Sequence, residues 1–144
     1  MGASIQWRLM FRVSSHRALD KCLARTLPLF GAGVEVGECK PYWKIPELWE
    51  CNLVSLIAAT SPAEQVLACL LTAKSLASRW YILGFLSAES ADGFSGVFDA
   101  KGQGGASGPA VGLEWASFRV GTCFAAEPHS WPTDLRTNEP PETA

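Results

Sequence analysis

The chain has 144 residues, with 12 basic and 14 acidic side chains and a formal net charge of −2. This length suits one domain with a sizeable core, and a hydrophobic fraction of 48% excludes a wholly disordered chain. The slightly negative charge argues against non-specific binding to nucleic acid or to anionic membranes, because both need a basic surface.

The N-terminal region predicts a strand followed by a helix. Apolar and polar residues alternate over residues 5–13, which indicates a strand with one buried face. Ser14 or Ser15 then caps a helix with one apolar stripe. Pro28 and Gly31 end this helix.

Two further strands are expected at residues 34–39 and 49–58. Pro41 and Pro46 exclude a central strand between them, so residues 41–48 should form an irregular connection at the surface. Apolar residues occupy both faces in the second half of the later strand, which predicts that this half is covered on both sides.

The next segment predicts a helix followed directly by a strand. Ser61 and Glu64 have the spacing of a capping box, and Pro62 suits the first helical position. Apolar residues at 66–77 occupy more than one helix face, which predicts a mostly buried helix. Residues 80–86 are rich in strand-forming side chains and predict a buried strand.

The C-terminal part is rich in glycine and then in proline, threonine and glutamate. Residues 96–99 and 113–120 predict two short strands that form a hairpin-like pair, joined by a flexible loop at 101–109. We therefore expect a single domain over residues 1–124 and a loosely ordered tail at 125–144.

The predicted order is β-α-β-β-α-β, followed by the C-terminal hairpin. The first six elements match the ferredoxin-like arrangement, in which both helices lie on one face of an antiparallel sheet. The hairpin would extend this sheet or fold over its open side. The expected fold class is therefore α+β, ferredoxin-like, with an extra C-terminal hairpin.

The cysteines indicate a reducing compartment. Their number is odd, and none form the C-x-x-C spacing of zinc knuckles or thioredoxin-like proteins. The five cysteines are Cys22, Cys39, Cys51, Cys69 and Cys123.

No signal-peptide pattern and no apolar run of roughly 20 residues is visible, so we expect a cytoplasmic protein.

Motifs for catalysis are absent, so we expect no enzyme activity, no cofactor and no metal. The glycine-rich segments match neither the dinucleotide-binding nor the P-loop spacing, and two Gly/Ser segments miss the nucleophile-elbow spacing by one residue. His16 and His129 are the only histidines, and a Cys123–His129 pair would lie close to the chain end. Glu35 and Glu38 fall on opposite faces of a regular strand, which favours a surface role over an acid–base pair.

The most informative functional feature is an aromatic and acidic segment around the predicted surface connection. Tyrosine and tryptophan concentrate in the energetic centres of protein interfaces. We therefore predict a partner-binding surface formed by Glu38, Tyr42, Trp43, Glu47 and Glu50. The alternative is that the rings cover the edge of the core.

A small, acidic α+β domain without catalytic motifs, ending in glycine-rich hairpins, resembles the immunity proteins of bacterial toxin–immunity pairs. The resemblance covers residues 5–121 in architecture and carries no functional residue across. It implies a bacterial, cytoplasmic, non-enzymatic protein that binds and inhibits a cognate toxin domain.

Two other functions are compatible with the sequence. One is a small-ligand module or small enzyme with a pocket between the sheet and the glycine-rich flap, lined by Trp80, Trp115 and Phe98. The other is a structural subunit that forms a homodimer through an exposed edge strand.

Overall fold

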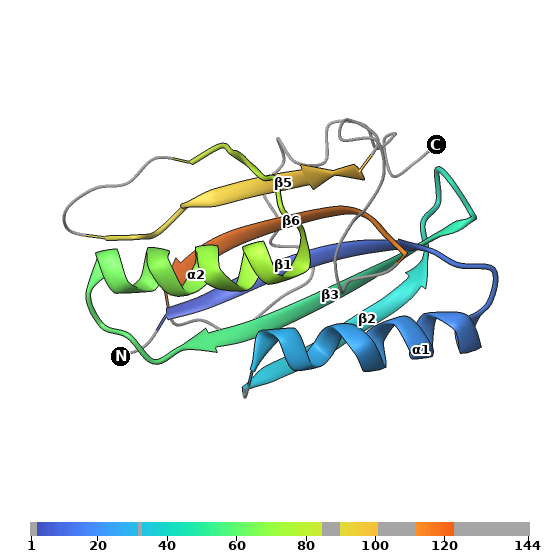
Figure 1. Ribbon diagram of the computed structural model, residues 1–144, viewed down its shortest axis with the longest axis horizontal. Helices are drawn as coiled ribbons and strands as arrows, with labels where there is room; N and C mark the ends of the chain where they lie inside the picture. Colours follow the sequence, from blue (N-terminus) through green and yellow to red (C-terminus); the bar gives the residue numbers. More distant parts are fainter. Residues whose placement is uncertain (1–2, 32, 85–89, 101–111, 123–144) are drawn as a thin grey trace.

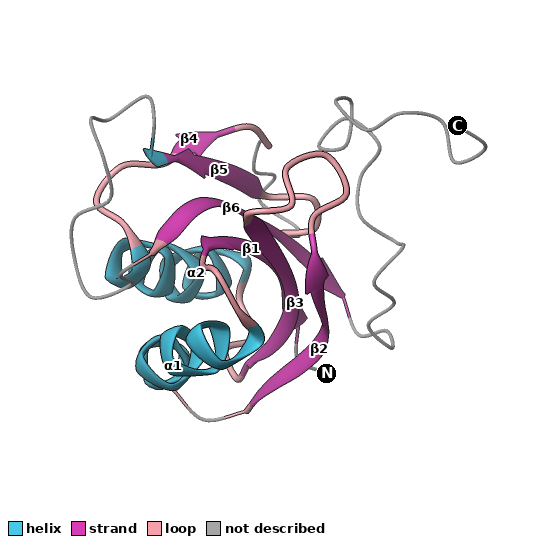
Figure 2. Ribbon diagram, turned by 90° about the vertical axis from the view of Figure 1, so that its right-hand side faces the viewer, coloured by secondary structure: helices cyan, strands magenta, loops and turns pink. Residues whose placement is uncertain are grey.

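A computed structural model describes residues 3–31, 33–84, 90–100 and 112–122. Within them, a six-stranded antiparallel sheet carries two α-helices on one face (Figures 1 and 2). The α+β class is therefore confirmed. The elements are β1 (Ala3–Arg12), α1 (His16–Thr26), the 3-10 helix η1 (Leu27–Phe30), β2 (Val34–Pro41), β3 (Leu48–Ile57), α2 (Pro62–Leu76), β4 (Tyr81–Ile82), β5 (Ser95–Asp99) and β6 (Leu113–Thr122).

The strand order is β2-β3-β1-β6-β5-β4, and it differs from the ferredoxin-like order that the sequence predicts. The first half agrees, because β3 lies between β1 and β2. In the second half, the strand that follows α2 should lie beside β1, but β6 has this place and β4 lies at the far edge. The pair β5 and β6, predicted to extend or cover the sheet, is antiparallel and lies within it.

The predicted buried strand at residues 80–86 is wrong in extent and burial. Within residues 80–84, the part of this range that the structure describes, only Tyr81–Ile82 is strand, and both side chains are exposed. A Cβ at Gly84 would collide with the backbone carbonyl of Gly93, so the chain passes β5 too closely for a regular strand with side chains. Trp80 turns back toward α2, where its Nε1 donates to the carbonyl of Ala73 at 2.8 Å.

Both helices begin where the capping residues predict. The Ser15 Oγ accepts a hydrogen bond from the Ala18 N–H at 3.1 Å, so Ser15 rather than Ser14 is the N-cap of α1. In α2, the Ser61 Oγ accepts from the Glu64 N–H at 3.2 Å and donates to its Oε1 at 3.0 Å. After η1, Gly31 has a φ of 73°, a left-handed value that glycine adopts without steric cost.

We expect Ser61→Ala to lower the free energy of unfolding by about 1 kcal/mol, because the Glu64 N–H loses its acceptor. Urea unfolding of the full chain measures this loss. Ser78→Ala is the control, since Ser78 is an exposed serine just beyond the other end of α2. Equal stability of the two variants would show that the cap contributes nothing.

The main core lies between the sheet and the two helices, and Trp7 of β1 is at its centre. Trp7 is fully buried, and its ring centroid lies 5.1 Å from that of Phe30 and 5.4 Å from that of Phe118. Its Nε1 donates to the Ser55 Oγ at 2.9 Å. The apolar half of β1 therefore holds strands and helices together, as its alternating pattern predicts.

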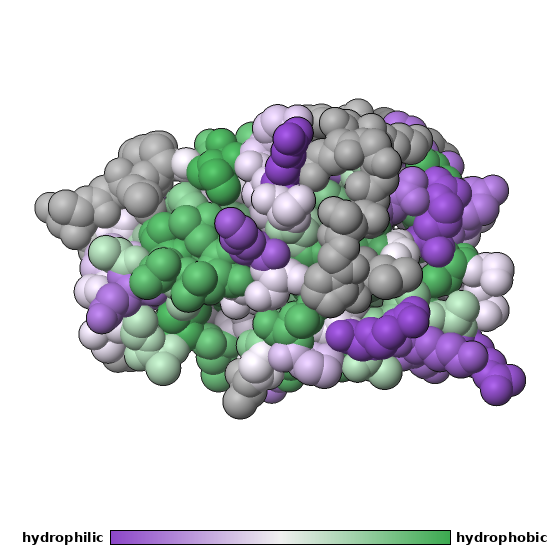
Figure 3. Space-filling view, viewed as in Figure 1, coloured by the Kyte–Doolittle hydropathy of each residue, from purple (hydrophilic) through white to green (hydrophobic). Residues whose placement is uncertain are grey.

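Two burial predictions are wrong. One concerns the side of α2 that faces away from the sheet, and the other concerns the sheet face opposite the helices. Leu67 and Leu71 of α2 are 57% and 61% exposed, so α2 buries only the side that faces the sheet. Figure 3 shows a hydrophobic surface in the region where α2 lies in Figure 1. Leu56 of β3 points to the opposite face and is 70% exposed, so the second half of that strand is not covered on both sides.

Candidate functional site

The candidate site lies on the sheet face opposite the helices. There the second set of β1 side chains, Ser4, Gln6, Arg8 and Met10, alternates with the core residues, and all four are buried. The sequence predicts a single buried face for this strand, so this is a correction. The reason is that β1 is an inner strand, flanked by β3 and β6, and its polar side chains lie among theirs.

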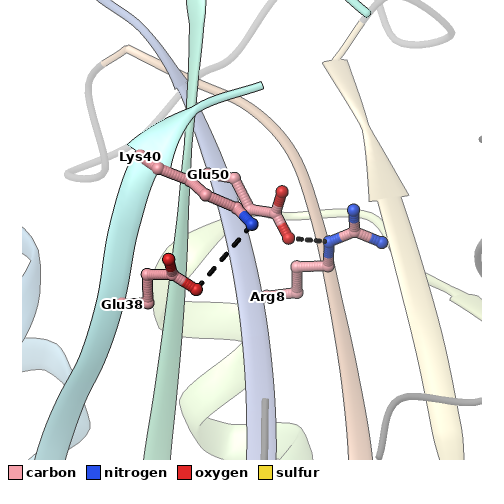
Figure 4. A network of polar contacts seen from close by, with 4 residues as sticks. All are labelled: Arg8, Glu38, Lys40 and Glu50. Carbon is pink, nitrogen blue, oxygen red and sulfur yellow. Dashed lines mark hydrogen bonds and ion pairs between the residues drawn. The ribbon is translucent and has the colours of Figure 1, made fainter. Parts of the chain in front are cut away.

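Arg8 and Glu50 form a buried ion pair in this face. The Arg8 Nε donates to the Glu50 Oε2 at 2.7 Å, and their side chains are only 2% and 6% exposed (Figure 4). The guanidinium carbon also lies 5.9 Å from the ring centroid of Tyr42 and 5.7 Å from that of Trp115. The carboxylate and the two rings together stabilise a cation that is costly to bury alone.

A small hydrophobic cluster closes the base of the connection between β2 and β3. Met10, Tyr42 and Leu48 are its buried members, and Ile45 and Trp115 pack against them. The Tyr42 N–H donates to the Leu48 carbonyl at 2.7 Å, and the Leu48 N–H donates to the Ile45 carbonyl at 2.9 Å. Residues 42–48 therefore form a compact, internally hydrogen-bonded loop, which projects at the right of Figure 1.

The five residues predicted to bind a partner divide into two layers. Trp43, Glu38 and Glu47 reach solvent, and Trp43 is 49% exposed. Tyr42 and Glu50 lie beneath them and are buried, so neither offers its side chain at the surface. The Trp43 ring centroid lies 5.6 Å from that of Tyr42, and the Tyr42 ring in turn lies 5.9 Å from the buried Arg8 guanidinium carbon.

Charge is more balanced on this surface than the acidic residues suggest. The Glu38 Oε1 lies 3.8 Å from the Lys40 Nζ (Figure 4). Lys44 is a second basic residue in the exposed segment. Arg8 neutralises Glu50 below the surface. The exposed part of this segment therefore presents the Trp43 ring together with charges of both signs.

Sequence reasoning missed Arg8 and misplaced Trp115. An arginine in an alternating strand is normally read as solvent-facing, and only the pairing of β1 with two neighbours buries it. Trp115 was predicted to line a pocket with Trp80 and Phe98, yet it lies half-buried over Arg8. Met10, an apolar residue in the polar half of the β1 alternation, is the signal that could have indicated this second buried face.

Three buried polar atoms on this face have no hydrogen-bond partner among the described residues: Ser4 Oγ, Asn52 Oδ1 and Ser117 Oγ. Asn52 and Ser117 are the register partners of Arg8 on its two sides, so polar groups form a row across three strands. Unpaired buried polar atoms reduce stability. Proteins tolerate such departures mainly near functional surfaces.

The alternative ligand pocket is not assembled in the predicted way. Phe98 and Trp80 pack with the core on the helix side, at a ring-centroid distance of 5.9 Å. Trp115 lies on the opposite sheet face, over Arg8. The three residues therefore do not line one cavity. The glycine-rich loop at 101–109 and the tail at 125–144 lie outside the described residues.

The described residues offer few groups for catalysis. His16 is exposed, with its Nδ1 3.4 Å from the Asp20 Oδ2. Burial raises the pKa of the Cys69 thiol, which makes it a poor nucleophile. No three histidine, cysteine or acidic side chains within the described ranges lie close enough to hold a metal ion. Cys123 and His129 lie outside these ranges.

No helix in the described part of the chain combines the length and apolar character needed to cross a bilayer. In comparisons with known proteins, no family model, no curated protein and no solved structure matches the chain. The fold and site define an antiparallel α+β protein with a buried ion pair beneath an exposed aromatic loop.

Proposed function

We propose that the protein is a non-enzymatic binding module whose partner is another protein. The observation that carries this proposal is Trp43, a large aromatic side chain that is half exposed on a loop with a fixed base. Tryptophan is enriched among the residues that dominate interface energies. A loop already held by Tyr42 and Leu48 loses little conformational entropy when it binds.

The more specific proposal is an immunity protein that binds and inhibits a cognate bacterial toxin in the cytoplasm. It is supported by the small α+β architecture and by the exposed acidic residues Glu38 and Glu47 on either side of Trp43 in the sequence. The matching toxin surface would have an apolar pocket for Trp43 with a basic rim. Complementary rim charges mainly accelerate association and select the partner.

We expect Trp43→Ala to weaken the complex with the partner by at least about 2 kcal/mol, or roughly 30-fold in Kd. The reason is loss of the buried aromatic contact. Tyr81→Ala is the control, because Tyr81 is 59% exposed but lies on the opposite edge strand. Calorimetry with the purified toxin domain encoded beside this protein's gene measures both. Equal affinities of the two variants would contradict this surface.

The inhibitory function has a separate test. Cells that express the neighbouring toxin domain should stop growing, and co-expression of the wild-type chain should restore growth. Trp43→Ala should restore it less well than Tyr81→Ala at equal protein levels. If the wild-type chain neither binds nor protects against that domain, the immunity proposal fails.

The edge strands do not favour a homodimer formed by strand pairing. β2 carries a register shift between Val36 and Cys39, with Glu38, Lys40 and Pro41 nearby. β4, at the other edge, has only two residues. Bulges, charges, proline and short length are the features by which edge strands avoid pairing with other chains. The binding proposal therefore rests on the loop.

A further inference from the structure

Two cysteines face each other across the strands that lead into the Trp43 loop. Cys39 of β2 and Cys51 of β3 are direct partners in the antiparallel register, and both are free thiols. Directly opposed residues in such a pair have Cα atoms about 4.5–5.5 Å apart. This separation falls within the range of about 4.4–6.8 Å that a disulfide spans. The two strands therefore need little movement to be cross-linked.

The two thiols differ in access. Cys39 is partly exposed on the edge strand, whereas Cys51 is completely buried in the main core. A small oxidant can therefore reach Cys39 first. Cys51 is inaccessible to thiols of other molecules, but it lies opposite Cys39 and can form a disulfide with it. The remaining described cysteines, Cys22 and Cys69, lie on different helices.

We propose that Cys39 and Cys51 are a site of reversible oxidation, at which a hydroperoxide converts the two thiols into a cross-strand disulfide. The inference does not depend on the proposed binding function. It assigns a chemical role to the one pair of described cysteines that the sheet places opposite each other.

The electronic arrangement supports Cys39 as the attacking group. A hydrogen bond from the Cys51 thiol lowers the pKa of Cys39, against an opposing effect of burial. The same hydrogen bond, together with burial, raises the pKa of Cys51. Thiolate is the nucleophilic form of cysteine, so the half-exposed Cys39 reacts before Cys51.

The reaction proceeds in two balanced steps. The Cys39 thiolate attacks one peroxide oxygen, the O–O bond breaks, and the departing oxygen takes a proton to leave water or an alcohol. Cys39 then carries a sulfenic acid. The Cys51 sulfur attacks the Cys39 sulfur, the S–O bond breaks, and the departing hydroxide takes the Cys51 proton to form water. The two thiols lose two electrons, which the peroxide gains.

The cross-link would close residues 40–50 into a ring that contains the whole Trp43 loop. A disulfide stabilises mainly by restricting the unfolded chain. Oxidation should therefore raise the melting temperature of the protein by roughly 5–10 °C. It should also keep β2 and β3 paired at the base of the loop.

Peptide mapping of the full chain after treatment with hydrogen peroxide tests the proposal. Free thiols are blocked, and the digest is analysed by mass spectrometry without reduction. We expect a linked peptide containing Cys39 and Cys51, lighter by about 2 Da than the sum of the two reduced peptides, that separates when dithiothreitol is added. Cys39→Ser should abolish it, whereas Cys69→Ala should leave it unchanged.

Other outcomes would overturn the proposal. Oxidation of Cys39 to sulfinic acid without a cross-link would show that Cys51 does not reach it. A disulfide joining Cys39 to Cys123, or to a second molecule, would assign it a different partner. A cross-linked protein that melts below its reduced form would show that the bond does not fit the folded sheet.

Discussion

Glu50→Ala is expected to lower the free energy of unfolding by about 3–5 kcal/mol, because it removes the carboxylate that contacts the buried Arg8 guanidinium at 2.7 Å. Tyr42 and Trp115 remain beside the cation, but ring faces compensate only part of the lost charge pairing. Urea unfolding of the full chain, with the slope compared between variants, measures the loss.

A second ion pair on the same strand is the control. The Arg12 Nε donates to the Glu114 Oε2 at 2.7 Å, the same atom types and distance as in the buried pair, but Arg12 is exposed. Glu114→Ala should cost much less, because water solvates the remaining charge. The double variant Arg8→Met/Glu50→Leu should recover most of the stability that Glu50→Ala loses. Similar losses for Glu50→Ala and Glu114→Ala would contradict the structure of this face.

Trp7→Ala should lower the free energy of unfolding by about 3–5 kcal/mol, since it removes the largest side chain in the core. The variant loses the contacts with Phe30 and Phe118, and it leaves the Ser55 hydroxyl without its donor. Chemical denaturation followed by far-UV circular dichroism measures the change.

Trp43→Ala is the matched control, because it makes the same chemical change at a half-exposed position. We expect a smaller loss of about 1 kcal/mol there, because the Trp43 ring contacts only the Tyr42 ring, at a centroid distance of 5.6 Å, among the described aromatic residues. A large loss at Trp43 would show that the ring is part of the loop's packing and would weaken its assignment to partner binding. A small loss at Trp7 would contradict the position of the core.

In the candidate site, the residue proposed for recognition is distinct from the residues that form the buried ion pair. Trp43 reaches solvent, whereas Tyr42 is buried at the base of the loop and lies beside the buried Arg8–Glu50 pair. A substitution at Trp43 should therefore change affinity, and one at Glu50 should change stability first. Binding by Glu50 variants should therefore be measured without denaturant, at a temperature at which circular dichroism shows the variant to be folded.

Several local features could be predicted from the residues alone. The alternation in residues 5–13 identified β1, and the capping serines Ser15 and Ser61 identified the starts of both helices. Pro41 and Pro46 indicated that the chain leaves the sheet between β2 and β3. These signals work because strand periodicity and helix capping depend on residues within a few positions of one another.

The strand order, the extent to which α2 is buried and the burial of Glu50 could not be predicted in the same way. Glu50 looks like a surface acid beside a loop, and it is buried because Arg8, 42 positions earlier, lies next to it on the neighbouring strand. Cys39 and Cys51 become partners only through the register of β2 and β3. β6 lies beside β1 near the centre of the sheet, although β4 and β5, which precede it in the sequence, lie farther out. Local patterns therefore determined where the strands and helices form, whereas long-range strand pairing determined which side chains are in contact. The reason is that many strand pairings satisfy the same hydrophobic pattern, and only packing of the whole sheet favours one of them.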